Sequence, residues 1–192
     1  AGFFAVLLPG KKIPSYTLIY WDGDGNQMEH YDPYAYPMQF TEQEQKQFEN
    51  GICYSIYEKL GAHPVKIDGI SGVYFAVWAP NAIRVSVVGN FNNWDGRAYQ
   101  MNLLESGIYE LFIPGVHAGD IYKYEIKAKG GLTYLKSDPY ANAAQLRPNN
   151  ASVVVDLGKY AGRNYMETTS TDLDTQQIKE SMGKCTNRHR EW

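Results

Sequence analysis

The chain has 192 residues, of which 44% are hydrophobic, and this is enough for the core of one domain or of one domain and part of a second. The formal net charge of −3 comes with no basic stripe, and no apolar run is long enough to cross a membrane. Nucleic acid and membrane partners are therefore not expected. The two cysteines, Cys53 and Cys185, make no disulfide framework, and no signal-peptide pattern is present, so the expected location is cytoplasmic.

The first 40 residues contain signals for short strands. Residues 1–8 and 16–21 have the composition of strands, and residues 22–26 (DGDGN) form a strong hairpin loop. The Asp and Asn side chains of this loop suggest calcium as an alternative. The full spacing of a calcium loop with its closing Glu is missing, however, so a plain turn is favoured and no metal or cofactor is predicted.

A short helix is predicted next. Thr41 and Glu44 have the spacing of a capping box, and the helix should end near Asn50 and Gly51. We interpret residues 41–64 as a linker that contains this helix, with residues 61–64 (GAHP) forming a loop before the next strand.

Short, turn-separated strands follow, which is typical of a β-sandwich rather than of a parallel α/β sheet. In residues 121–127 the alternation predicts that Tyr122 and Tyr124 face the core while Lys123 faces outward. The predicted strands lie at 65–67, 73–78, 84–88, 108–113, 121–127, 132–136 and 152–156. This sandwich is assigned to residues 65–158, and residues 159–192 form a polar tail in which residues 172–182 could make a marginal helix.

Residues 89–96 (GNFNNWDG) form a polar corner between two strands. The indole of Trp94 offers an apolar plate for a pyranose ring, and amides such as that of Asn93 offer donors and acceptors for its hydroxyls. A hairpin turn with Trp94 tucked into the core is the other interpretation, and residue types alone leave both open.

The chain also contains an internal repeat. Residues 2–10 (GFFAVLLPG) and 107–115 (GIYELFIPG) match, as do residues 32–35 and 138–141 (DPYA in both). Several predicted strands precede the second copy, whereas the first copy begins at residue 2. Residues 1–40 are therefore interpreted as the C-terminal half of an upstream sandwich, which should pack on the second copy, pair with another chain or be poorly ordered.

At this point the motifs resemble a known family. They are residues 61–64 (GAHP), 72–82 (GVYFAVWAPNA), 87–96 (VVGNFNNWDG), 122–124 (YKY), 136–141 (KSDPYA), 147–148 (RP) and 151–152 (AS). As a set they are similar to the amino-terminal module of bacterial 1,4-α-glucan branching enzymes, which belongs to carbohydrate-binding module family 48. The resemblance implies an all-β, immunoglobulin-like β-sandwich that binds α-glucan, and it implies that residues 1–40 are like the extra upstream module of some of these enzymes.

The resemblance also implies which residues contact glucose. By position these are Trp94, with Asn93 beside it, Lys123 and Asn150, with Asn149 as the alternative to Asn150. Relatives carry a second aromatic plate before the Asp-Pro pair, and Tyr134 is the only aromatic side chain available here. Read from residue types alone, Lys123 is also explained as a solvated lysine, Asn150 as a turn residue and Tyr134 as a structural tyrosine.

Catalysis is not expected of this chain alone. The family's retaining chemistry needs an Asp nucleophile and a Glu acid/base on a (β/α)₈ barrel of about 250 residues, and residues 159–192 cannot supply one. The predicted partners are α-glucans such as glycogen, starch and maltooligosaccharides. The alternative is a structural module that docks on a (β/α)₈ catalytic domain and binds little sugar.

Overall fold

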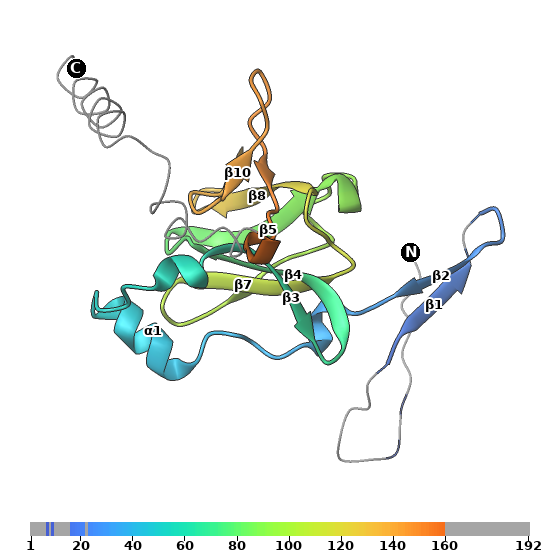
Figure 1. Cartoon of the computed structure of the whole chain (residues 1–192), viewed down its shortest axis with the longest axis horizontal. Helices are drawn as coiled ribbons and strands as arrows, with labels where there is room; N and C mark the ends of the chain where they lie inside the picture. The colour runs from blue at the N-terminus through green and yellow to red at the C-terminus, as the bar shows by residue number, and fades with distance from the viewer. Residues whose placement is uncertain (1–6, 8, 10–15, 22, 160–192) are drawn as a thin grey trace, which may run out of the picture. The chain divides into compact units, whose positions relative to one another are not determined.

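The structure is a computed structural model that describes Leu7, Pro9 and residues 16–21 and 23–159. Its main feature is a pair of antiparallel sheets (Figure 1). The first, which we name the β4 sheet, has the order β3 (Gly61–Ile67), β4 (Ile70–Trp78), β7 (Ile108–Pro114), β6 (Asn102–Leu103). The second, the β8 sheet, has the order β10 (Ala143–Ala144), β11 (Ser152–Val153), β8 (Ile121–Ala128), β5 (Ala82–Gly89), and β9 (Thr133–Lys136) also pairs with β8.

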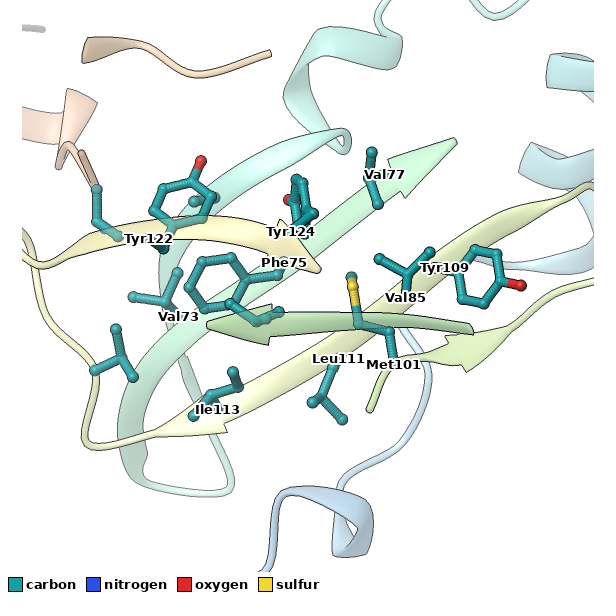
Figure 2. Close-up of a cluster of buried hydrophobic side chains, with 14 residues drawn as sticks. Val73, Phe75, Val77, Val85, Met101, Tyr109, Leu111, Ile113, Tyr122 and Tyr124 are labelled. Atoms are coloured by element: carbon teal, nitrogen blue, oxygen red, sulfur yellow. The ribbon is translucent and has the colours of Figure 1, made fainter. Parts of the chain in front are cut away.

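The core lies between the two sheets. Val73, Phe75 and Val77 point inward from β4, and Tyr122 and Tyr124 point toward them from β8 (Figure 2). The rings of Phe75 and Tyr122 pack edge to face with centroids 5.0 Å apart. The predicted alternation of β8 is confirmed, because Tyr122 and Tyr124 are buried while Lys123 remains partly exposed.

Residues 33–60, which we name the belt, cover the outer face of the β4 sheet. Phe40 and Leu60 are buried against Tyr74, Ile108 and Phe112, which form a second apolar cluster. The belt contains the 3-10 helices η1 (Pro33–Ala35) and η2 (Ile56–Glu58) and the helix α1 (Glu42–Glu49). The predicted capping box is present, with the Glu44 N–H donating to Thr41 and the Thr41 N–H donating to Glu44.

A buried carboxylate fastens the belt to the sheet. Glu110 on β7 accepts hydrogen bonds from the N–H groups of Gln39 (3.0 Å) and Phe40 (3.1 Å) and from the Tyr74 hydroxyl (2.5 Å). Burial raises the pKa of Glu110, and these three donors oppose the rise. Composition gave no sign of this charge in the core.

Glu110 should make stability depend on pH. As pH rises, the unfolded carboxyl ionises first while the folded one keeps its proton, so this group's contribution is present below its ordinary pKa and is lost as pH rises through the raised value. Urea unfolding followed by circular dichroism between about pH 4 and pH 7 should show a steeper decline for the wild type than for Glu110→Gln, which cannot titrate. Parallel curves for the two proteins would contradict this assignment.

The internal repeat is present in the structure as a repeated hairpin. β1 (Leu18–Trp21) and β2 (Gln27–His30) pair with Leu18 opposite His30, and β8 and β9 pair with Tyr124 opposite Lys136, the same positions 106 residues later. The hydrogen bonds repeat too: the Tyr16 hydroxyl donates to Asp32, as the Tyr122 hydroxyl donates to Asp138. The environments differ, because Leu18 is 50% exposed whereas Tyr124 is fully buried.

Some strand boundaries differ from the predictions. Residues 61–64 were expected to form a loop but belong to β3, which tolerates Pro64 because β3 lies at the edge of its sheet. The expected strand at 152–156 is ordered as a strand only over Ser152–Val153, and β6 and β10, with two residues each, were not predicted. Most of the expected strand at 1–8 and the expected helix at 172–182 lie outside the described residues.

A second compact unit begins at Asp156, and its described part is the 3-10 helix η4 (Leu157–Lys159). Within the described ranges, no helix has the length and apolar character needed to cross a membrane.

Candidate functional site

The outer face of the β8 sheet carries the predicted site residue Lys123, and Asn150 contacts it there. Directly paired residues share a face, so Val88 of β5 lies beside Lys123 of β8, and Ser86 lies beside Glu125. Since Tyr122 and Tyr124 face the core, Lys123 and Glu125 face away from it.

The polar corner at residues 89–96 is built by its own side chains. The carboxamide of Asn92 accepts from the Gly89 N–H (2.9 Å) and donates to the Val87 carbonyl (3.0 Å) and the Asp95 carbonyl (3.2 Å). Asn93 and Trp94 have positive φ values of 51° and 60°, so the chain turns sharply here. The Asn92 carboxamide therefore makes its hydrogen bonds within the loop. Asn93 and Trp94 are left as the outward-facing members of the corner.

Trp94 is partly exposed and belongs to neither apolar cluster, so the corner does not tuck its indole into the core. Its Nε1 donates to Asn90 Oδ1 at 2.9 Å. This bond fixes the ring, and a fixed, partly exposed indole offers a flat apolar surface to a ligand at little entropic cost.

Glu125 links this corner to β8. A Cβ atom added to Gly96 would lie 2.2 Å from Glu125 Oε1, so the loop after Trp94 lies directly against that carboxylate. Arg84 of β5 holds the same carboxylate with an Nη2–Oε1 distance of 2.5 Å. The Trp94 loop therefore rests on a charged pair that lies on the same face as Lys123.

Lys123 and Asn150 are brought together, with 2.5 Å between Lys123 Nζ and Asn150 Oδ1. The Ser137 hydroxyl donates to the Asn150 carbonyl and so ties the segment before β11 to the end of β9. Asn149 is exposed in the preceding turn, where its N–H donates to the Leu146 carbonyl at 3.1 Å. Of the two asparagines, Asn150 is the one that meets Lys123.

Tyr134 is not brought to this face. It pairs with Ile126 and therefore shares the side of the sheet opposite to Lys123, where the Lys136 ammonium lies 5.6 Å from its ring centroid. The outward position belongs to Leu135, which pairs with Glu125 and is 48% exposed. Leu146, at the turn between β10 and β11, is 89% exposed. Sequence reasoning named neither leucine, and the outward position of Leu135 depends on the register of β8 with β9.

Asp138 supports the strands beneath this face. It is buried, and its Oδ2 accepts from the hydroxyls of Tyr122 (2.6 Å) and Tyr124 (3.2 Å). Its own N–H donates to Ser152 Oγ at 2.9 Å, which holds β11 and hence the Asn150 segment in place. Burial raises the pKa of Asp138, and the bonds from Tyr122 and the Tyr140 N–H oppose that rise.

Comparison with known families decides what this sandwich is. Residues 59–141 match the family Carbohydrate-binding module 48 (Isoamylase N-terminal domain). This segment is similar to the family 48 carbohydrate-binding modules. The match extends from the end of η2 to the Asp-Pro-Tyr-Ala corner after β9, and the immunoglobulin-like β-sandwich implied by the sequence is confirmed.

Whole-chain relatives agree with the module. The chain is 49% identical over 161 residues to the 1,4-alpha-glucan branching enzyme of Synechococcus sp. (strain JA-3-3Ab), covering 79% of this chain and 21% of that protein. It is 47% identical over 180 residues to that of Trichodesmium erythraeum, covering 92% of this chain and 23% of that protein. The module and its flanks thus span about a fifth of the length of these relatives.

Two solved pullulanase structures match part of this chain. Pullulanase from Klebsiella pneumoniae in complex with maltotriose is 28% identical, covers 53% of this chain and 10% of that one, and superposes with a TM-score of 0.43. Pullulanase from Bacillus acidopullulyticus is 23% identical, covers 56% and 13%, and has a TM-score of 0.44.

Proposed function

We propose that the outer face of the β8 sheet binds α-glucan and that the chain is a non-catalytic accessory region of a branching enzyme. The observation that carries this proposal is the Lys123–Asn150 pair with the exposed Leu135 on one face, beside a loop that carries Trp94 and rests against Glu125 of the same face. The names of the relatives supply the class of sugar, since they are 1,4-alpha-glucan branching enzymes.

The chemistry of the face suits a glucan. The indole of Trp94 packs against the apolar face of a pyranose ring, and the exposed Leu135 adds apolar surface for a further unit. Lys123 donates to sugar hydroxyls while the Asn150 carboxamide both accepts and donates. No cofactor takes part. Because the contacts are few and open to water, we expect weak binding to a single sugar and retention on a polymer that offers many sites.

Removal of the indole should abolish glucan retention. In a native gel that contains glycogen, the wild-type chain should be slowed relative to a gel without polysaccharide. Trp94→Ala should migrate equally in both, because loss of a stacked aromatic removes about 1–3 kcal/mol of binding, or about a tenfold to hundredfold decrease in affinity.

Trp21 offers a matched control, because it is an exposed tryptophan on the β1–β2 hairpin. Trp21→Ala should keep the retention of the wild type. Equal migration of the wild-type chain with and without glycogen would remove the proposal. Equal retention of Trp94→Ala and the wild type would remove the role of the indole.

A docking role is the second candidate, and it is favoured by aromatic side chains away from the proposed face. Trp78 is 53% exposed at the end of β4, where it packs edge to face against Phe48 of α1 with centroids 5.9 Å apart. These aromatic side chains could contact a catalytic (β/α)₈ domain in a longer protein. A chain that only docks would show no glycogen retention in the same gel.

A further inference from the structure

A second concave site lies at one end of the sandwich. The hollow has a volume of about 440 Å³, within the range of small-ligand sites. Four segments line it: the end of β2, the turn between β3 and β4, the stretch after β5 and the end of β7. Neither Trp94 nor Lys123 lines it, so the hollow is separate from the outer face of the β8 sheet.

One wall of the hollow is aromatic and fixed by the core. The rings of Phe91 and Tyr99 lie with centroids 6.0 Å apart and planes inclined by 42°. Phe91 also contacts Phe75 of the core, with centroids 6.4 Å apart, and Ile70 continues this apolar wall. A rigid, tilted aromatic pair is a surface against which the C–H face of a sugar ring packs well.

The lining also contains polar side chains. They belong to Glu29, His30, Tyr31 and Ser71. The nearby carboxylate of Glu29 raises the pKa of the Tyr31 phenol, which places the two side chains close together. A carboxylate, an imidazole and a phenol together supply acceptors and donors for several hydroxyls of one ligand.

The segment that ends in Tyr31 is tethered to the sandwich close to the aromatic wall. The Tyr34 hydroxyl, three residues after Tyr31, donates to the Gln100 carbonyl at 2.9 Å, next to Tyr99. Burial, followed by the nearby phenols of Tyr20 and Tyr34, raises the pKa of Tyr99, which places all three tyrosines in one neighbourhood. The segment with the polar residues is therefore tied to the sandwich within one compact unit.

We propose that this hollow is a second carbohydrate site, which takes one or two glucosyl units at an end of an α-glucan chain. A lining that combines an aromatic surface with hydroxyl-bonding groups matches a neutral sugar, which has an apolar ring face and a polar rim. The volume suits a short segment rather than a polymer passing through. The identity of the sugar as α-glucan rests on the function proposed above; the site itself rests on its own walls.

The test is a maltose titration of the full chain followed by ¹H–¹⁵N NMR. Saturable shifts are expected at Gly69, Ser71 and Gly115, which line the hollow, and these should persist in Trp94→Ala. Ser71→Phe adds a ring to the lining of the hollow and should lower the maltose affinity obtained from these shifts at least about tenfold. Ser55→Phe, at another exposed serine, should leave them unchanged.

His30→Ala is the second variant, because it removes one polar group of the wall at a strand end and should lower the same affinity about threefold to tenfold. Absence of saturable shifts at Gly69, Ser71 and Gly115 in the wild type would overturn the site. Unchanged affinity in both Ser71→Phe and His30→Ala would overturn it as well. Failure of the outer-face proposal has a different signature, the absence of shifts at Trp94 and Lys123.

Discussion

The Asp138→Ala variant is expected to lose about 3 kcal/mol of unfolding free energy, measured by urea denaturation with circular dichroism. The substitution removes the acceptor of two buried hydroxyls, those of Tyr122 and Tyr124. A buried polar group left without a partner loses about 1–3 kcal/mol, and Tyr124 keeps a longer bond to the Ala76 carbonyl at 3.4 Å. Because Tyr122 and Tyr124 flank Lys123 on β8, loss of their acceptor should also lower glycogen retention.

The internal repeat provides a matched control for this prediction. Asp32 accepts from the Tyr16 hydroxyl and the Tyr34 N–H in the same arrangement, but this copy of the corner is largely exposed to water. Water replaces the lost acceptor at an exposed site, so Asp32→Ala should lose less than about 1 kcal/mol. Equal losses at Asp32 and Asp138 would show that burial does not set the strength of this corner.

The Gly96→Ala variant is expected to bind glycogen about tenfold more weakly than the wild type. Its free energy of unfolding should fall by about 1–3 kcal/mol. Its methyl group would lie 2.2 Å from Glu125 Oε1, an impossible contact. The end of a glutamate can usually move aside, but Arg84 holds this one at 2.5 Å. Either the ion pair breaks or the loop with Trp94 rises from the sheet, and both changes disturb the proposed glucan face.

A double-mutant cycle separates these two causes. Glu125→Ala should relieve the clash, so the Gly96→Ala/Glu125→Ala protein should be more stable than the sum of the single changes predicts. Gly23→Ala is the neutral control, because nothing lies within 4 Å of its added Cβ. Additive losses in the cycle, or wild-type retention by Gly96→Ala, would show that the loop does not depend on Glu125.

Local patterns were enough to predict much of the module. The alternation in residues 121–127 placed Tyr122 and Tyr124 in the core, and the capping box placed α1, because both patterns depend on neighbouring residues alone. The two-residue strands β6 and β10 carry no such pattern, since they are defined by their pairing with β7 and with β11. Glu110 was equally hidden, because its partners Gln39 and Phe40 lie about 70 residues away in sequence.

The site shows the same division between local and long-range information. The sequence indicated the outward direction of Lys123, and the resemblance indicated Asn150, which contacts Lys123 in the structure. The glucose-binding roles of these residues and of Trp94 remain predictions. It could not indicate whether Tyr134 or Leu135 faces Lys123, because that depends on the register of β8 with β9. A shift of one residue in that hairpin exchanges an aromatic ring for an aliphatic side chain.

The belt also determines the valency of the module toward a polymer. A β-sandwich has two broad outer faces, and residues 33–60 occupy that of the β4 sheet with Phe40 and Leu60. Among the described residues, the broad face left for a long polysaccharide strand is the one with Lys123. Tight attachment to a glucan particle would therefore require avidity, from several copies, from the end-binding hollow proposed above or from sites elsewhere in a longer protein.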